Sequence, residues 1–584
     1  MSLGANLLIK VLSYLKRYWY IAALSPLFMI LEVSMDLLQP DLMSKIVDDG
    51  VLAGNMDVIL EVGIQMVIFT LIGCIGGILS GVFGNMAAQS FSNDLRKDAF
   101  SRVMGMSFQQ TDKFTTGSLV TRLTNDITAC QDFVGMALRM MVRTVMQFVG
   151  GIYMVLHIDV RFGLILLVTL PIQLIIVAVV LKKGAPLFGI VQSKLDRVNT
   201  VVQENVSGAR VVKAYTREQY EIDRFGAAND DLCNTNLRVQ RLMALLVPVL
   251  SILMNASVLA VIYIGGLQVK AQELEVGRIM AAITYITQIL MSVMMIGMMF
   301  QQVTRASASA KRIREVLDAD PVIAGGDFDG VTNEKGTVEF KNISFRYPGV
   351  QAGNVLEDIS FRVNKGETVA ILGATGCGKT SLVNLIARFY DATEGTVLVD
   401  GVDVREYDLD ALRGKIGFVL QKSELFSDTI ENNIRWGKPD ATDAEIKTAA
   451  EIAQADSFIQ GFSDGYKDMV TEKGTSLSGG QKQRLSIARA IVKKPEILIF
   501  DDSMSALDLT TDAKLQKALR EHFDDTTVIM IAQRVASVMN ADKIAVIEDG
   551  RLAAFDNHEN LMKSCDVYQD IYNSQMREGD EQVG

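Results

Sequence analysis

Gly373-Ala-Thr-Gly-Cys-Gly378-Lys379-Thr380 is the stretch that decides the fold of the C-terminal half of this chain. It matches the pattern GxxxxGK[ST] and follows the apolar run Glu367-Thr-Val-Ala-Ile-Leu372, which is typical of a strand. Between a strand and a helix, such glycines let backbone N–H groups surround a phosphate at the positive end of the helix. The pattern predicts a nucleotide site in which Lys379 neutralises phosphate and the Thr380 hydroxyl binds Mg²⁺. The residues expected at this site are Gly373, Ala374, Thr375, Gly376, Cys377, Gly378, Lys379, Thr380 and Ser381.

A second stretch, Glu496-Ile-Leu-Ile-Phe500-Asp501-Asp502, is an apolar run that ends in two carboxylates. A buried strand that delivers Asp501 beside the phosphate loop is what a magnesium ligand requires. An apolar strand ending in Asp is weak evidence by itself, but the upstream phosphate loop makes it strong.

The N-terminal half has a different composition. The whole chain of 584 residues is 49% hydrophobic and 21% charged, with a mean hydropathy of +0.24. It is too apolar for a disordered chain and too charged for a pure membrane bundle. Six apolar stretches have about the ~20 residues that a membrane helix needs. They run approximately over 19–46, 58–83, 137–157, 162–181, 243–267 and 278–300.

The distribution of basic residues predicts how these helices are oriented. The connections 84–136 and 182–241 are rich in Lys and Arg, whereas the opposite connections hold only Lys45, Arg161 and Lys270. Basic connections stay on the cytoplasmic side, and an even number of spans leaves both ends on one side. We therefore expect a multi-pass protein of the cell membrane with cytoplasmic termini and long cytoplasmic helical extensions.

A change in amino-acid composition near residue 316 predicts the domain boundaries. The segment Val316-Leu-Asp-Ala-Asp-Pro321 and its continuation are acidic and Gly-rich, which is typical of a linker, and strand and helix patterns alternate after it. We expect a six-helix membrane domain over 1–315, a linker over 316–335, and an α/β phosphate-loop ATPase domain with a helical subdomain over 336–584. The net charge of −11 and the pI near 5.1 argue against nucleic acid as a partner.

Between the two nucleotide motifs lies Leu477-Ser478-Gly479-Gly480-Gln481, another Gly-rich start of a helix, suited to hold a γ-phosphate. With this motif the C-terminal half resembles the ATP-binding cassette (ABC) proteins. The resemblance implies that Ser478, Gly479, Gly480 and Gln481 close over ATP bound to the opposite cassette, so that two chains share each nucleotide. The implied ligands are ATP and Mg²⁺.

Further positions match the family's motifs residue by residue. Tyr347 resembles the aromatic residue that stacks on adenine; a strand-edge tyrosine is the alternative. Gln421 resembles the glutamine that contacts Mg²⁺ and the attacking water. Ser505 and Asp508 lie in Ser505-Ala-Leu-Asp508, which resembles the loop between the two sites, and Glu472 resembles a contact to the cytoplasmic helices.

Nearly the whole chain resembles a half-transporter of the ABC exporters, with six membrane helices followed by one cassette. Residues 204–224 also resemble the exporter segment that docks on a cassette. A soluble ABC protein that acts on DNA or ribosomes is excluded by the six spans. An importer is disfavoured because importers usually separate the membrane and ATPase chains.

Two positions depart from the family pattern. The catalytic base is normally a glutamate, but here it is Asp502, and Gln533 stands where the family has histidine. The missing methylene withdraws the carboxylate by roughly 1.5 Å, and a misplacement of ~1 Å can cost about a hundredfold in rate. Glutamine can hydrogen-bond a phosphate but cannot carry a positive charge. Together these changes predict a site that binds ATP and hydrolyses it poorly.

The intact signature beside an altered catalytic site resembles the degenerate subunit of a heterodimeric multidrug-type exporter. The expected partner is therefore a second half-transporter, with a homodimer as the alternative. The expected substrate is an amphipathic small molecule, since Met291, Met294, Met295, Met298 and Met299 offer an adaptable surface, although these methionines could equally fill packing gaps or face lipid. A lipid or peptide exporter and a nucleotide-gated receptor or channel that does not pump remain alternatives.

Two carboxylates interrupt the first membrane helix. Glu32 and Asp36 are four residues apart and therefore lie on one helix face. Because carboxylates facing lipid are costly, we expect both to face the translocation cavity, where they could attract cationic substrates. Hydrogen bonding to neighbouring helices without a role in transport is the alternative.

Overall fold

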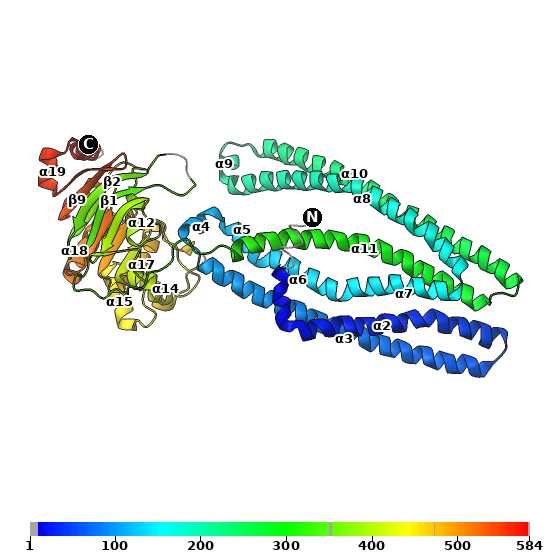
Figure 1. Ribbon diagram of the computed structural model, residues 1–584. Helices are drawn as coiled ribbons and strands as arrows, with labels where there is room; N and C mark the ends of the chain where they lie inside the picture. The colour runs from blue at the N-terminus through cyan, green and yellow to red at the C-terminus, as the bar shows by residue number, and fades with distance from the viewer. Residues whose placement is uncertain (1–9, 350–352, 472–473, 582–584) are drawn as a thin grey trace. The chain divides into compact units, whose positions relative to one another are not determined.

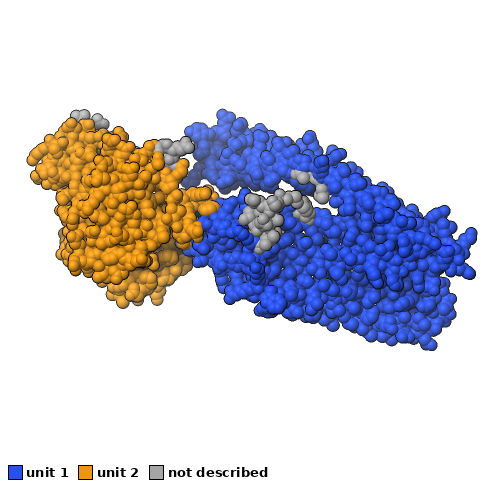
Figure 2. Space-filling view, viewed as in Figure 1, with its two compact units in different colours: residues 1–104, 116–319 blue, residues 105–115, 320–584 orange. Residues whose placement is uncertain are grey.

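The structure is a computed structural model that describes residues 10–349, 353–471 and 474–581. The chain forms two compact units, which Figure 2 shows in different colours. The helical unit comprises residues 1–104 and 116–319, and the ATPase unit comprises residues 105–115 and 320–584.

Long helices make up the helical unit, as Figure 1 shows. Among the described residues, six helical segments are long and apolar enough to cross a membrane, which confirms the six predicted spans. They are Lys10–Leu52, Met56–Met104, Thr116–Ile158, Val160–Ser207, Glu218–Lys270 and Val276–Leu317. The shortest has 42 residues. At ~1.5 Å per residue even this one is about 63 Å long, twice the ~30 Å of hydrocarbon, so each helix continues far beyond the bilayer.

These segments contain the main helices of the unit, broken in places by short π-helical turns. The helices are α2 (Trp19–Lys45), α3 (Met56–Met104), α5 (Thr116–Thr121), α6 (Ile127–Met136), α7 (Val142–Ile158), α8 (Val160–Ser207), α9 (Ala209–Ala214), α10 (Glu218–Lys270) and α11 (Val276–Leu317).

Close packing joins α2, α7 and α11 in the membrane-spanning part. Tyr285 of α11 is fully buried and its hydroxyl donates to the Leu37 carbonyl of α2 at 2.5 Å. Gly151 of α7 lies so close to α11 that a Cβ there would be 2.7 Å from Ile289 Cγ1. Small residues that let helices approach in this way are the usual means of association where lipid weakens the hydrophobic effect.

Two sheets form the frame of the ATPase unit. The six-stranded sheet has the order β10-β9-β3-β8-β7-β6, with parallel pairing from β9 to β6 and an antiparallel edge strand β10. Its central strands β7 and β8 are buried along their whole length, as parallel strands covered on both faces must be. A four-stranded antiparallel sheet has the order β2-β1-β4-β5. The strands are β1 (Val338–Phe345), β2 (Leu356–Val363), β3 (Thr368–Leu372), β4 (Glu394–Val399), β5 (Val402–Asp403), β6 (Ile416–Val419), β7 (Ile497–Asp501), β8 (Thr527–Ile531), β9 (Lys543–Glu548) and β10 (Arg551–Asp556).

Helices cover this frame, and α14 to α17 form the predicted helical subdomain between β6 and β7. The helices of the ATPase unit are α4 (Phe108–Lys113), α12 (Lys379–Ile386), α13 (Leu409–Lys415), α14 (Ile430–Arg435), α15 (Asp443–Ile452), α16 (Asp456–Ile459), α17 (Gly479–Ile491), α18 (Leu509–His522), α19 (His558–Ser564) and α20 (Asp566–Glu581). The predicted fold class, a membrane helical domain followed by an α/β ATPase domain, is confirmed.

Candidate nucleotide site

Four adjacent strands bring the predicted nucleotide residues together. In the parallel part of the sheet, β3, β8, β7 and β6 are neighbours and run in the same direction. The phosphate loop follows β3, Gln533 follows β8, Asp501 ends β7 and Gln421 follows β6. Because ligands bind at the carboxyl ends of parallel strands, this edge is the candidate site.

The phosphate loop requires glycine where it turns into α12. Gly378 caps the helix with φ +100°, and a Cβ there would lie 2.5 Å from Leu356 Cδ2 and 3.0 Å from the Val355 carbonyl. Only glycine tolerates both conditions. The helix therefore starts with free N–H groups directed into the loop, as phosphate binding needs.

Lys379 lies inside its own loop. Its ammonium group donates to the carbonyls of Gly373 and Ala374, both at 2.8 Å, and only 8% of the residue is exposed. A buried ammonium held by neutral carbonyl groups keeps its positive charge available for a phosphate.

The two predicted magnesium ligands on the loop and on β7 are in contact. The Thr380 hydroxyl donates to Asp501 Oδ1 at 2.7 Å. Burial raises the pKa of Asp501; the neighbouring Asp502 raises it further, and the hydrogen bond from Thr380 and the charge of Lys379 oppose the rise. A carboxylate whose charged form is disfavoured by burial gains most from a nearby cation, so these residues fit Mg²⁺.

Asp502, at the position of the catalytic base, is held by both neighbouring glutamines. Gln533 Nε2 donates to Asp502 Oδ2 at 2.7 Å, and Gln421 Nε2 donates to the same oxygen at 3.3 Å. The residue is buried and has φ +48°, a left-handed conformation that is uncommon for a residue with a Cβ. One oxygen of the candidate base therefore already accepts two amide protons.

Tyr347 lies against the same loop helix. Its hydroxyl is 2.9 Å from Ser381 Oγ, and its ring packs edge-on against Tyr390 with centroids 5.2 Å apart. The structure thus brings Tyr347 to the phosphate loop, while its stacking on adenine stays a prediction.

The signature residues form a capped helix start. Ser478 precedes α17, its hydroxyl accepts from the Gln481 N–H at 3.3 Å, and the Gln481 side chain accepts from the Ser478 N–H at 2.9 Å. Gly479 has open space around it, and a Cβ on Gly480 would lie 3.2 Å from the Ala506 carbonyl. This reciprocal capping leaves the glycine backbone available at the positive end of the helix.

Ala506 belongs to the loop predicted to connect two nucleotide sites. In this loop the Ser505 hydroxyl donates to the Asp502 carbonyl at 2.9 Å, and Asp508 caps α18 by accepting from the Thr511 N–H at 3.1 Å. The loop therefore links the candidate base to the signature helix. Glu472 lies outside the described residues.

A residue of the C-terminal helix that the sequence motifs did not indicate also belongs to the site. Gln575 of α20 donates to the Gln533 carbonyl and accepts from the Val535 N–H, both at 2.7 Å. One side-chain amide thus clamps the backbone on both sides of the turn that carries Gln533. A cavity of about 490 Å³ lies between this helix and the phosphate loop, lined among others by Gly373, Gln533 and Gln575.

A short segment between membrane helices also packs within the ATPase unit. Asp112 of α4 accepts a hydrogen bond from the Tyr390 hydroxyl at 2.6 Å, and Phe108 packs on Phe389 with ring centroids 4.5 Å apart. Burial and the Asp112 carboxylate raise the pKa of Tyr390. No local motif marks this segment; only its position between two membrane helices could have suggested it.

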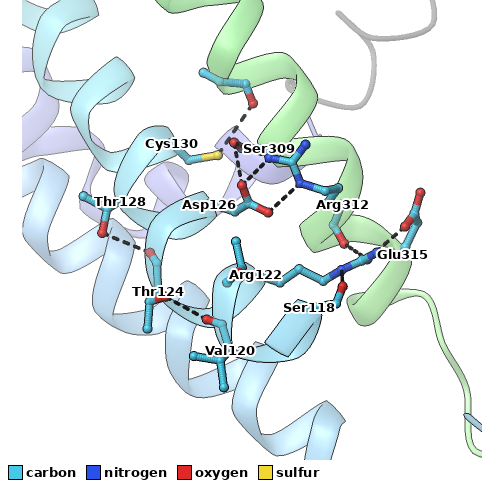
Figure 3. A network of polar contacts seen from close by, with 12 residues as sticks. Ser118, Val120, Arg122, Thr124, Asp126, Thr128, Cys130, Ser309, Arg312 and Glu315 are labelled. Atoms are coloured by element: carbon cyan, nitrogen blue, oxygen red, sulfur yellow. Dashed lines mark hydrogen bonds and ion pairs between the residues drawn. The ribbon is translucent and has the colours of Figure 1, made fainter. Parts of the chain in front are cut away.

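The helical unit holds a second set of polar contacts, which Figure 3 shows. Asp126 is buried and accepts from Ser309 Oγ at 2.8 Å and from Arg312 Nε at 2.7 Å, both on α11. One turn away, Arg122 donates to Glu315 at 2.8 Å and to the Arg312 carbonyl at 2.6 Å. These contacts fix the helical segment Thr116–Ile158 to the end of α11, which leads to the ATPase unit.

The carboxylates predicted to face a cavity share one arginine. Arg143 of α7 donates to Glu32 Oε1 at 2.8 Å and to Asp36 Oδ2 at 3.2 Å. The Glu32 side chain is only 14% exposed. The positive charge of Arg143 offsets part of the negative charge of this pair, which weakens the expected attraction for cations. Their exposure to a translocation cavity stays a prediction.

Comparison with known families agrees with both units. A family described as ABC transporter transmembrane region matches residues 23–293, and a family described as ABC transporter matches residues 356–505. An uncharacterized ABC transporter ATP-binding protein of Bacillus subtilis is 39% identical over 577 residues, which cover 98% of this chain and 99% of the relative. The fold and the site define a membrane protein driven by a nucleotide, and these matches show that the chain belongs to the ABC transporter family.

More distant similarities agree with the predicted exporter half-transporter. A solved structure of a bacterial Atm1-family ABC exporter with ATP bound superimposes with a TM-score of 0.80 and 26% identity, covering 95% of this chain and 98% of the other. A fatty acid ABC transporter ATP-binding/permease protein of Mycobacterium bovis is 35% identical over 83% of this chain and 76% of its own. A mitochondrial potassium channel ATP-binding subunit of Xenopus tropicalis is 34% identical over 84% of this chain and 71% of its own. The predicted resemblance to ABC exporter half-transporters is confirmed.

Proposed function

We propose that this chain is one half of a heterodimeric ABC exporter that uses ATP to move amphipathic small molecules, and that its own catalytic site is impaired. The observation that carries the proposal is the contact of both Gln533 and Gln421 with one oxygen of Asp502. A general base must present a free lone pair to water, and positioned general-base catalysis is worth about 10²–10⁴-fold in rate. An aspartate that is both shorter than glutamate and already hydrogen-bonded forfeits much of this factor.

Binding of ATP does not depend on that base. Lys379 would neutralise the phosphates, the N–H groups at the start of α12 would surround them, and Thr380, Asp501 and Gln421 would hold Mg²⁺, which neutralises developing charge on the transferred phosphoryl group. The site is therefore proposed to hold MgATP with ordinary affinity and to turn it over slowly.

In the proposed heterodimer, the signature residues serve the second nucleotide site, which is built on the partner. Ser478 and Gln481 cap α17 so that its N–H groups remain free to hold a γ-phosphate. In a heterodimer they would complete a nucleotide site whose catalytic glutamate and histidine come from the partner. ATP hydrolysis would then occur mainly at the site to which this chain contributes its signature.

The proposed setting is the cell membrane, with both termini and the ATPase unit in the cytoplasm. The basic connections 84–136 and 182–241 support this orientation, since such connections are retained on the cytoplasmic side. The proposed substrate is an amphipathic small molecule, with the methionines of α11 as adaptable contacts; Met291 is exposed.

Two alternatives have a relative that favours them. The fatty acid transporter of Mycobacterium bovis favours a lipid exporter, and the potassium channel subunit of Xenopus tropicalis favours a channel regulator that does not pump. ATP-dependent accumulation of an amphipathic dye in inverted vesicles distinguishes a pump from a channel regulator, because a channel only dissipates a gradient.

The test of the impaired site compares the chain alone with the chain and its partner half-transporter. In liposomes the chain alone should hydrolyse ATP slowly, and the pair should lose nearly all activity when the partner's catalytic glutamate is replaced by glutamine. Steady-state ATP hydrolysis at saturating MgATP is the measurement. High activity of the chain alone would contradict the proposal.

A further inference from the structure

Arg139, at the inner end of the third membrane-spanning segment, carries a positive charge that the described part of the chain does not neutralise. We propose that Arg139 binds the acidic headgroup of the exported amphiphile, a carboxylate or phosphate that carries an apolar tail. This inference rests on the proposed export function and specifies its substrate class.

The neighbouring Arg143 is a useful comparison, because carboxylates pair with its positive charge. Arg143 lies four residues from Arg139, on the same helix face, and is bound by both Glu32 and Asp36. The positive charge of Arg143 is thus paired with carboxylates inside the protein. Loss of Arg143 would leave two carboxylates at membrane depth without a partner, so we assign it a structural role.

Arg139 has no such arrangement. Its Nε is buried without a hydrogen-bond partner, and within the described ranges its guanidinium forms neither a hydrogen bond nor an ion pair with another side chain. Two glycines of α3 lie close to the Arg139 side chain. A Cβ on Gly84 would lie 3.2 Å from Arg139 Cδ, and one on Gly81 would lie 3.6 Å from its Nη1.

At these two positions α3 therefore presents no side chain, and no counter-ion, to the guanidinium. Ser25, the nearest polar side chain across Gly84, already donates to the Ser80 carbonyl at 2.9 Å. A planar cation with five donors and no acceptor partner is suited to bind a carboxylate or phosphate in a bidentate manner.

The depth of Arg139 in the membrane fits a headgroup. Arg139 lies in the π-helical turn that precedes α7. The helical segment ends at Ile158, at the proposed outer side, nineteen residues beyond Arg139. At ~1.5 Å per residue this is about 28 Å, nearly the whole ~30 Å of hydrocarbon, so Arg139 lies at the level of the inner-leaflet headgroups. An amphiphile taken from the inner leaflet would place its polar end at this level and its tail beside the more deeply placed apolar part of the helix.

Electrostatics favours an anion over a cation or a neutral group at this position. An arginine partly removed from water and without a counter-ion is costly, and an anionic ligand removes that cost when it binds. A cationic amphiphile would meet the unneutralised charge and be repelled.

The test measures binding by thermal stabilisation of the full chain in phosphatidylcholine nanodiscs without nucleotide. Dodecyl phosphate, dodecanol and dodecyltrimethylammonium share one tail and differ in headgroup charge. We expect dodecyl phosphate to raise the melting temperature in a saturable manner and the other two to have no such effect. Arg139→Gln should weaken apparent binding of dodecyl phosphate at least about tenfold, and Arg139→Lys should retain part of it, since lysine keeps the charge but not the bidentate geometry.

Two controls separate a ligand-binding arginine from a structural one. Arg161→Gln removes an arginine at the outer side that pairs with Glu273 at 2.8 Å, and it should leave dodecyl phosphate binding unchanged. In the absence of ligand, Arg139→Gln should melt no lower than the wild-type chain, whereas Arg143→Gln should melt lower.

Equal stabilisation by the three amphiphiles, or binding by Arg139→Gln within twofold of the wild type, would overturn the inference. If Arg139→Gln does not fold, the role is structural and the inference is also overturned, unless Arg139→Lys folds and shows the headgroup preference with weaker binding. Headgroup-selective binding without any ATP-driven transport contradicts the proposed function alone. ATP-driven transport without Arg139-dependent binding contradicts this inference alone.

Discussion

The two parts of the chain that are built to meet a nucleotide differ in how they are held. At the signature, Ser478 and Gln481 cap each other and leave the glycine backbone unoccupied. At the catalytic edge, Asp502 is already bound by Gln533 and Gln421 before any water arrives. The difference teaches that one cassette can hold two nucleotide motifs in opposite ways: the signature has open glycines, whereas one oxygen of Asp502 is already hydrogen-bonded.

The largest effect should come from a change at the signature. Gly480→Asp should reduce ATP hydrolysis by the assembled pair about a hundredfold, because the new carboxylate repels phosphate at a helix N-terminus and crowds the Ala506 carbonyl, 3.2 Å from the added Cβ. Steady-state ATP hydrolysis is the measurement. Gly414→Asp, which adds the same charge where a Cβ meets nothing within 4 Å, is the control and should change little. Equal activity of the Gly480 and Gly414 variants would remove the signature from the active site.

A gain of function should follow when the family residues are restored at the catalytic edge. Asp502→Glu combined with Gln533→His should raise ATP hydrolysis by the chain alone about tenfold to a hundredfold, because a longer base and an imidazole replace the amide-bound aspartate. Single-turnover hydrolysis of radiolabelled ATP is the measurement, and Gln533→His alone is the matched control. No gain in the double variant, with normal ATP binding, would mean that something else limits this site.

The clamp at the C-terminal helix should have a smaller effect. Gln575→Ala removes both hydrogen bonds to the turn at Gln533 and should lower the turnover of the restored site about threefold, with little change in KM for MgATP. Gln569→Ala on the same helix is the control, since the Gln569 side chain donates to the Met562 carbonyl at 2.9 Å rather than to the turn at Gln533. A loss of MgATP binding rather than turnover would show that the clamp supports the phosphate loop instead.

The smallest effect should come from removal of the aspartate itself. Asp502→Ala should change ATP hydrolysis by the assembled pair less than about twofold, because in the proposed heterodimer the partner's site supplies the turnover. The pair with the partner's catalytic glutamate replaced by glutamine is the reference for complete loss. If Asp502→Ala abolishes hydrolysis, the assignment of competent and impaired sites is reversed.

Local patterns predicted most of this molecule. The phosphate loop, the strand that ends at Asp501 and the signature are short motifs whose chemistry depends on neighbours in sequence, and the structure forms each where the sequence indicated. The six membrane spans were equally accessible, because the cost of leaving a polar backbone in lipid enforces long apolar helices.

The contacts that sequence could not predict join distant positions. Arg143 meets Glu32 across more than a hundred residues, and Gln575 meets Gln533 from a different element. Glutamines and arginines are common on helix surfaces, so nothing local marks these as partners. The bond between Gln533 and Asp502 was similarly hidden: each substitution was visible, but their direct contact required the fold.

The placement of α4 within the ATPase unit has a consequence for the order in which the chain is made. Tyr390, which bonds to Asp112, follows it by 278 residues. At roughly 5–20 residues per second of synthesis, about 14–56 s pass before the ribosome delivers that partner. During this interval, while the following membrane helices are made, the ring of Phe108 lacks the Phe389 and Tyr390 rings that it later contacts. Until the cassette has folded, the nascent protein therefore carries an apolar side chain without the aromatic partner that it has in the complete structure.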